Sequence, residues 1–212
     1  MPVQVISSSQ QWVYNYFPNI AYRVVGIAAS LGGLQAMATI LSELPASFPA
    51  AIVIVQHLSP RYPSHLARIL KRHTALRVKQ AEAGELLRPG TIYTAVPNQH
   101  LLMTLEGTLH FSSEERINFC RPAADLMLKS IASVYQRRAI AVILTGRGCD
   151  GALGAAAIKQ HGGIVIAQNK ATSRCFSMPN AAINTGCVDW VLPVEAIAPR
   201  LINLLMSDSL VS

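Results

Sequence analysis

Short runs of β-branched and other apolar residues alternate along this chain with segments whose apolar positions recur at the spacing of a helix face. The first run, residues 24–27, has the composition of a buried strand, and in the stretch after it Leu34, Met37 and Leu41 would share one helix face. Such an alternation is typical of a mostly parallel α/β sheet. The same pattern predicts further strands at residues 50–55, 139–145, 164–168 and 188–192, a helix carrying Leu66, Ile69 and Leu70, and helices at residues 124–138, 151–160, 178–183 and 194–206.

Shorter pieces interrupt this alternation between residues 76 and 112. Glu106 and Gly107 lie between two apolar pieces and predict a hairpin turn. Pro122 suits the first turn of the helix that follows it, and Pro199 should shorten or kink the last helix. Residues 1–21 show no convincing period, so we interpret them as an N-terminal extension of one domain that covers residues 22–207.

The composition fits a globular protein with a sizeable core. Of the 212 residues, 51% are hydrophobic and 14% are charged, and no apolar run is long enough to span a bilayer. The amino terminus lacks the basic and apolar regions of a secretory leader. The four cysteines have no metal-binding spacing and are interpreted as free thiols of a cytoplasmic protein.

The net charge of +7 raises the question of an acidic partner. No nucleic-acid motif is present and aromatic residues make up only 6% of the chain, so we expect no nucleic-acid partner. Two interpretations of the basic residues remain: a solvated face, and a docking surface for an acidic protein. The strongest basic cluster consists of Arg61, Arg68, Lys71 and Arg72.

The turn between the first predicted strand and helix carries Ser30, followed by Gly32 and Gly33. A serine in a tight strand–turn–helix connection has the geometry of a nucleophile elbow, beside free helix N–H groups that attract negative charge. Serine is also a good helix N-cap, and that interpretation remains open. The pattern argues against a dinucleotide loop, because Ala28 and Leu31 stand where it requires glycine, and against a phosphate loop, because no lysine followed by Ser or Thr comes after the glycines. A nucleotide-binding module stays the last alternative.

Ser30, His57 and Asp150 each follow the end of a predicted strand. The carboxyl ends of parallel strands meet at one edge of a sheet, where ligands bind. A serine hydroxyl becomes an effective nucleophile when an imidazole takes its proton and a buried carboxylate orients that imidazole. The coincidence of the three positions favours a hydrolase. The alternatives are a packed histidine at position 57 and a helix N-cap at Asp150.

A hydrolase site also needs donors for the charge on its tetrahedral intermediate. The helix start at Leu31 and Gly32 and the turn at Arg147 are the candidate sources of backbone N–H groups. Other aspartates do not fit the third position. Asp125 lies on a predicted helix and Asp189 opens the last strand, so neither occupies the edge of the sheet.

These residues also carry a family resemblance. The segments GIAASLGG with Ser30, VIVQH with His57 and AVILTGRGCDGA with Asp150 are similar to the catalytic domain of CheB, the family of chemotaxis protein-glutamate methylesterases. So are YTAVPNQHLLM, RPAADLML and AQNKATSRCFSMPNAAI, and the motifs occur in order between residues 22 and 205. The resemblance implies a doubly wound, mostly parallel sheet flanked by helices, with an antiparallel hairpin addition.

The implied activity is hydrolysis of γ-glutamyl methyl esters on methyl-accepting chemotaxis receptors, which releases methanol, and in many members deamidation of receptor glutamines. Carried over by position, Ser30 is the nucleophile, His57 the general base and acid, and Asp150 the orienting carboxylate. The backbone N–H of Arg147 helps to hold the oxyanion. No metal and no organic cofactor is implied. The residues assigned to substrate binding are Gln56 and Met178.

The implied partners are acidic cytoplasmic helices of receptors, and the positive charge of this chain fits such a surface. Family members typically carry an amino-terminal receiver domain that is phosphorylated on aspartate. This chain has no aspartate before Asp125, so we expect no receiver domain within it, and a separate response regulator is a candidate partner.

Departures from the family pattern keep two alternatives open. Leu31 stands where the family usually has threonine, and Arg147 where methionine is usual. Cys149, interpreted as a buried turn thiol, stands where asparagine is usual. The alternatives are a catalytically weakened homologue that binds receptors or another signalling protein, and an esterase with another substrate.

Overall fold

Seven parallel strands form the central sheet of the computed structural model, which describes residues 23–57 and 62–206. The strand order is β3-β4-β2-β1-β7-β8-β9, and β5 and β6 pair as a separate antiparallel hairpin. In chain order the elements are β1 (Arg23–Ala29), α2 (Gly33–Ser42), β2 (Ala50–Gln56), α3 (Leu66–Leu70), η1 (Lys71–His73), β3 (Arg77–Gln80), β4 (Thr91–Thr94), β5 (His100–Met103), β6 (Leu109–Ser112), α4 (Ala124–Tyr135), η2 (Gln136–Arg138), β7 (Ala139–Ile143), α5 (Ala152–Gln160), β8 (Ile164–Gln168), α6 (Ser177–Ile183), β9 (Trp190–Leu192) and α7 (Val194–Met206).

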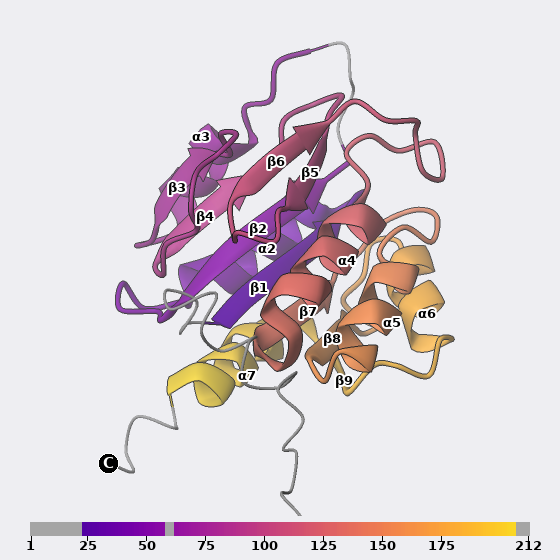
Figure 1. Ribbon diagram of the computed structural model, residues 1–212. Helices are drawn as coiled ribbons and strands as arrows, with labels where there is room; N and C mark the ends of the chain where they lie inside the picture. Colours follow the sequence, from indigo (N-terminus) through magenta and orange to yellow (C-terminus); the bar gives the residue numbers. More distant parts are fainter. Residues whose placement is uncertain (1–22, 58–61, 207–212) are drawn as a thin grey trace, which may run out of the picture.

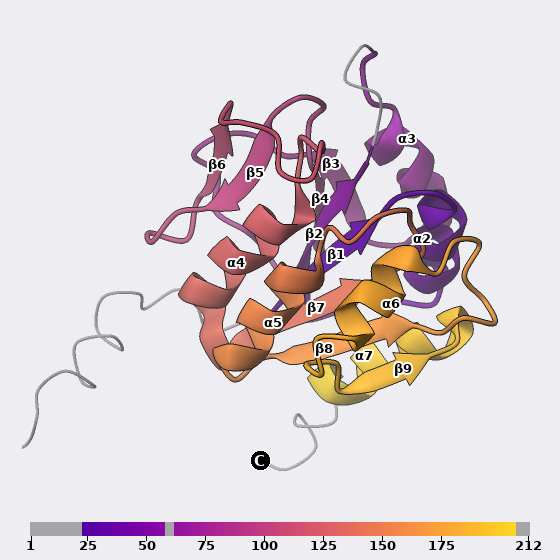
Figure 2. The same ribbon diagram turned by 90° about the vertical axis from the view of Figure 1, so that its right-hand side faces the viewer.

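Helices cover both faces of the sheet (Figures 1 and 2). The helices α4, α5 and α6 and the hairpin lie on one face, and α2, α3 and α7 lie on the other. Successive residues of β1 serve the two faces in turn: Val24 and Ala28 belong to one core cluster, and Val25 and Ile27 to the other. Because both faces are covered, the central strands are apolar throughout rather than alternating with polar residues.

The winding of the chain changes direction between β1 and β7. From β1 the chain passes to β2, then to β3 at the edge of the sheet and back to β4 between them. It later returns to β7 on the other side of β1 before continuing to β8 and β9. The register pairs Ala29 with Gln56 and Ala28 with Ile143, so the three central strands end close to the same level. This switch point is where open parallel sheets form a ligand-binding crevice beyond their strand ends.

The predicted α/β class is confirmed, and each predicted strand and helix occurs with small shifts at its ends. The predicted hairpin also occurs, with Gly107 in the left-handed region at φ 79°. One proline prediction is wrong, because Pro122 precedes α4, which begins at Ala124. The helix α7 continues through Pro199 to Met206 without being shortened, and a kink at Pro199 stays a prediction.

Some sequence predictions fall outside the described part of the chain. These are the proposed extension, residues 1–21, and one member of the basic cluster, Arg61. The described members of that cluster, Arg68, Lys71 and Arg72, are exposed around α3 and η1. Over residues 23–57 and 62–206, no helix has the length and apolar character required to cross a membrane.

Candidate functional site

Ser30 lies in the turn between β1 and α2, at the carboxyl edge of the sheet. Its backbone N–H donates to the carbonyl of Thr145 at 3.0 Å, and its own carbonyl accepts from the Gln56 side-chain amide at 2.8 Å. The N-cap of α2 is Gly32, at a left-handed φ of 85°, and no side chain caps this helix. The N-cap interpretation of Ser30 is therefore wrong, because its side chain lies in the strand–helix turn and makes no capping hydrogen bond to α2.

The turn after β7 approaches Ser30 closely. A Cβ added to Gly146 would lie 2.7 Å from the Cβ of Ser30 and would overlap Sδ of Met178, so only glycine fits at this position. The backbone N–H of Met178 donates to the carbonyl of Gly146 at 3.0 Å, and the side chain of Met178 is fully buried. Met178 thus packs against the Gly146 turn, and its contact with a substrate stays a prediction.

His57 follows β2 directly, and its backbone N–H donates to the carbonyl of Ala29 at 3.0 Å. Its ring Nε2 lies 2.7 Å from Oδ2 of Asp150. Asp150 is 1% exposed, and its carboxylate also accepts from the backbone N–H groups of Ala124 at 2.7 Å and Asp125 at 2.9 Å. Two backbone donors therefore fix the carboxylate, and the carboxylate in turn fixes the imidazole.

Asp125 takes part in this arrangement, although the sequence interpretation set it aside. Its Oδ1 accepts from the N–H groups of Gly151 and Gly154 at the start of α5, while Asp150 accepts at the start of α4. Asp150 does not cap the helix that follows it, so its N-cap interpretation is wrong. Burial raises the pKa of Asp125, and the nearby charge of Asp150 adds to this, whereas the Gly154 N–H opposes it.

The opposite side of the His57 ring faces a thiol. An ionised Asp150 can only accept a hydrogen bond, so the neutral ring carries its proton on Nε2 and leaves Nδ1 as the acceptor. The Sγ atom of Cys120 lies 3.7 Å from this Nδ1. Burial lowers the pKa of His57, but the hydrogen bonds to Asp150 and Cys120 and the charges of both groups raise it to about 9.

Cys120 had no sequence signal that linked it to His57, because its loop meets the strand end only in the folded chain. It lies between β6 and α4, 63 positions from His57, and is partly buried. Within the part of the chain that the structure describes, the candidate set of metal ligands comprises His57, Cys120 and Asp150, whose ligand atoms lie within 4.8 Å of one another.

Ser30 and His57 line one cleft of about 530 Å³ at the switch point of the sheet. Among the described residues, no hydrogen bond joins the Ser30 hydroxyl to the His57 ring. The structure therefore brings His57 and Asp150 into contact and places Ser30 in the same cleft. The residues that line it are Ser30, Leu31, Gly32, Leu34, Gln35, Gln56, His57 and Arg174.

The predicted oxyanion donors lie in the turns next to Ser30 and Asp150. Over the described residues, no acceptor takes the backbone N–H of Leu31, Gly32 or Arg147, so these donors are available to a ligand. The side chains of Leu31 and Arg147 are exposed. Cys149 is exposed as well, so its interpretation as a buried turn thiol is wrong.

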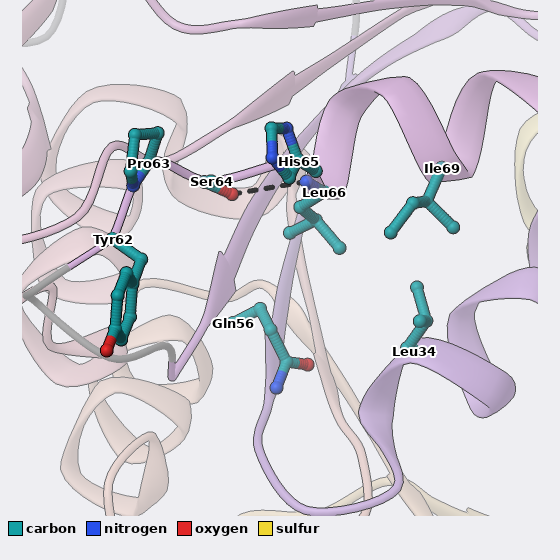
Figure 3. Close-up of a pocket in the computed structure, with 8 residues that line it drawn as sticks. All are labelled: Leu34, Gln56, Tyr62, Pro63, Ser64, His65, Leu66 and Ile69. Carbon is teal, nitrogen blue, oxygen red and sulfur yellow. Dashed lines mark hydrogen bonds between the residues drawn. The ribbon is translucent and has the colours of Figure 1, made fainter.

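A second hollow of about 260 Å³ adjoins the cleft and shares Leu34 and Gln56 with it. Figure 3 shows Leu34 on α2 and Ile69 on α3 facing each other across this hollow, with Gln56 projecting from the end of β2. Gln56 is 8% exposed, and no described residue donates to its Oε1. This carbonyl oxygen is thus a buried acceptor between an apolar hollow and the cleft. The remaining lining residues are Tyr62, Pro63, Ser64, His65 and Leu66.

Comparison with known proteins gives a consistent family match. The family model described as CheB methylesterase matches residues 25–201. A relative from Leptospira interrogans is 42% identical over 86% of this chain and 95% of its own length. The protein-glutamate methylesterase/protein-glutamine glutaminase of Thermotoga maritima is 42% identical over 88% of this chain and 55% of its own length. The protein-glutamate methylesterase FrzG of Myxococcus xanthus is also 42% identical, over 88% of this chain and 56% of its own length.

The chain therefore spans almost all of the Leptospira relative and about half of the other two. Among solved structures, the catalytic domain of the Thermotoga maritima CheB methylesterase matches with a TM-score of 0.83 and 41% identity. That match covers 87% of this chain and 99% of the Thermotoga domain.

Proposed function

Because this chain belongs to the CheB methylesterase family, we propose that it is a serine hydrolase that demethylates γ-glutamyl methyl esters of methyl-accepting chemotaxis receptors. The same chemistry applied to a glutamine side chain would make it a receptor deamidase. The observation that carries the proposal is the His57–Asp150 pair, 2.7 Å apart, in the cleft that Ser30 also lines.

The proposed reaction begins when Oγ of Ser30 bonds to the ester carbonyl carbon and its proton passes to His57. The proton then moves to the methoxy oxygen, the carbon–oxygen bond breaks, and methanol leaves an acyl-enzyme. Water repeats the sequence against the acyl-enzyme, releasing the glutamate carboxylate and restoring Ser30. With a glutamine substrate, ammonia leaves in the first half instead of methanol.

The proton acceptor in this scheme is Nδ1 of His57, because Nε2 donates to Asp150. Asp150 selects this tautomer and stabilises the imidazolium that forms during each transfer. General base help of this kind contributes about 10²–10⁴-fold to the rate. The unoccupied backbone N–H groups of Leu31, Gly32 and Arg147 are the proposed donors to the oxyanion.

The substrate side of the proposal rests on charge and on Gln56. Oε1 of Gln56 is a buried acceptor without a described donor, suited to a backbone or side-chain N–H of the receptor segment. Exposed Arg147 and cleft-lining Arg174 add positive charge where a glutamate-rich helix would approach. The chain's net charge of +7 acts in the same direction.

A binding module with weakened catalysis is the second candidate, and two observations favour it. No hydrogen bond joins the Ser30 hydroxyl to His57 within the described chain, and Nδ1 instead faces Cys120. Leu31 also places an exposed aliphatic side chain beside the proposed nucleophile. This candidate predicts negligible turnover with intact receptor binding.

The decisive experiment incubates the purified chain with receptor membranes whose glutamyl esters carry a labelled methyl group. We expect release of labelled methanol by the native chain and by Ser133→Ala, which changes an exposed serine on α4. We expect none above background from Ser30→Ala. Continued release by Ser30→Ala would remove Ser30 from the mechanism. Negligible release by the native chain with intact receptor binding would favour the binding module, and cleavage of small esters with the receptor untouched would point to another substrate.

A further inference from the structure

The side of the His57 ring that faces Cys120 has the features of a metal-binding site. A histidine that binds a metal through one ring nitrogen commonly donates the other N–H to a carboxylate, which fixes the tautomer and the direction of the free lone pair. His57 already has this support from Asp150, whose carboxylate is held by the N–H groups of Ala124 and Asp125. The lone pair of Nδ1 is therefore directed without any rearrangement.

The distance across the pair also fits one metal ion. Two ligands of a tetrahedral zinc ion, with Zn–S and Zn–N bonds of about 2.3 and 2.0–2.1 Å, lie about 3.6 Å apart. The Sγ atom of Cys120 and Nδ1 of His57 are 3.7 Å apart. A thiolate with an imidazole favours Zn²⁺ over Mg²⁺ or Ca²⁺, which prefer oxygen ligands. The His57 side chain is 15% exposed and Cys120 is partly buried, so neither ligand is fully shielded from solvent.

We propose that Cys120 Sγ and His57 Nδ1 bind one Zn²⁺ ion, with solvent molecules completing its coordination and Asp150 supporting the histidine from behind. Binding releases the thiol proton and any proton on Nδ1 to solvent, because the thiolate and the neutral imidazole are the ligands. The ion then occupies the lone pair that accepts the proton of Ser30, so a bound ion switches the hydrolase off reversibly. The binding itself stands independently of the proposed function, whereas the inhibition rests on it.

The first test measures binding of Zn²⁺ alone to the full chain after treatment with a chelator. Calorimetry should show one ion per chain, with proton release seen in buffers of different ionisation enthalpy. Co²⁺ in place of Zn²⁺ should give a thiolate-to-metal charge-transfer band. Cys120→Ser should lose the stoichiometric binding and the band. Cys187→Ser, a matched change on the loop after α6, should keep both. Circular dichroism establishes that each variant is folded.

The second test measures the effect of Zn²⁺ on hydrolysis. At saturation we expect the native rate to fall by about 10²–10⁴-fold, the share that a general base supplies, and to recover when chelator is added. Cys120→Ser, compared with its own rate without metal, should lose most of this inhibition. Absence of stoichiometric binding, or equal binding by Cys120→Ser, would overturn the proposed site. Stoichiometric Zn²⁺ binding by a chain that does not hydrolyse the receptor ester would instead support the zinc site and contradict the proposed hydrolase function.

Discussion

Asp125 lies in α4 and Asp150 lies just before α5, and the carboxylate of each accepts hydrogen bonds from backbone N–H groups at the start of the other's helix. Asp150 accepts from the first turn of α4, which contains Asp125, and Asp125 accepts from the first turn of α5, which follows Asp150. This exchange fixes Asp150 against His57 and joins α4 to α5 at the edge of the cleft. Asp125 therefore helps to orient the His57 imidazole through Asp150, although it does not contact the ring itself.

Removal of Asp125 should affect stability and activity together. Asp125→Ala leaves the N–H groups of Gly151 and Gly154 without their acceptor, so we expect the free energy of unfolding to fall by about 1–3 kcal/mol. We also expect kcat/KM to fall because Asp150 loses its fixed position. Urea unfolding and steady-state kinetics measure the two effects. Asp125→Asn keeps one amide oxygen as an acceptor and should recover part of both losses. Full activity in Asp125→Ala would show that α5 does not position Asp150.

The pH dependence of activity should report His57. Burial lowers its pKa, but Asp150 and Cys120 raise it to about 9, and only the neutral ring can accept the proton of Ser30. With chelator present, kcat/KM should therefore rise with pH up to about 9. Cys120→Ser removes one of the groups that raise the pKa, so its profile should move to lower pH. An unchanged profile in Cys120→Ser would mean that the thiol does not influence the base.

The same pKa has a consequence for stability. The folded-state pKa of His57 lies above its ordinary value of 6.5, so its protonated form stabilises the fold. This contribution should be complete below pH 6.5 and lost as pH rises to about 9. His57→Gln should flatten the unfolding free energy across this range in chemical denaturation, while Cys187→Ser, which lies away from the ring, should keep the native dependence. Equal slopes in the native chain and in His57→Gln would contradict the assignment.

A side chain at position 146 should displace Ser30. The added Cβ of Gly146→Ala would meet Met178 and the Cβ of Ser30, and such overpacking costs about 1–3 kcal/mol. We expect a lower melting temperature and a large loss of kcat. Gly186→Ala is the control, since its φ of 72° is unfavourable for alanine but nothing lies within 4 Å of the added Cβ. It should lose stability and keep activity.

Gln56 should support the turn that carries Ser30 and should contribute to substrate binding. Gln56→Leu removes the amide that donates to the carbonyls of Ser30 at 2.8 Å and His57 at 3.2 Å, and it removes the Oε1 acceptor. An unsatisfied partner costs about 1–3 kcal/mol, so kcat/KM should fall about tenfold or more. Gln160→Leu, at an exposed end of α5, should leave kinetics unchanged. Native kinetics in Gln56→Leu would exclude Gln56 from the site.

The positions of Ser30, His57 and Asp150 at the strand ends could be predicted because the rule that governs them is local. A buried apolar strand that ends in a polar residue, in a parallel sheet, places that residue at a known edge. The N-cap interpretations failed for a different reason. Local sequence does not reveal which helix a carboxylate or hydroxyl meets, and Asp150 meets α4 rather than α5.

The roles of Asp125 and Cys120 could not be predicted, because both depend on contacts between distant segments. Asp125 reads locally as a polar residue in a helix, and only the packing of α4 on α5 gives its carboxylate two partners. The sequence shows Cys120 only as a thiol in a loop, and its contact with His57 exists only in the folded chain. The burial of Met178 against Gly146 likewise depends on the fold, and its contact with a substrate stays a prediction.

The switch point between β1 and β7 means that Ser30 and His57 are synthesised before the carboxylate that orients the imidazole. Ser30 and His57 leave the ribosome early, whereas Asp150 follows His57 by 93 positions and needs the second winding of the sheet. A nascent chain, or a proteolytic fragment that ends before β7, would hold the hydroxyl and the imidazole without the carboxylate that orients them. If the proposed mechanism holds, we expect such a shortened chain to lack esterase activity.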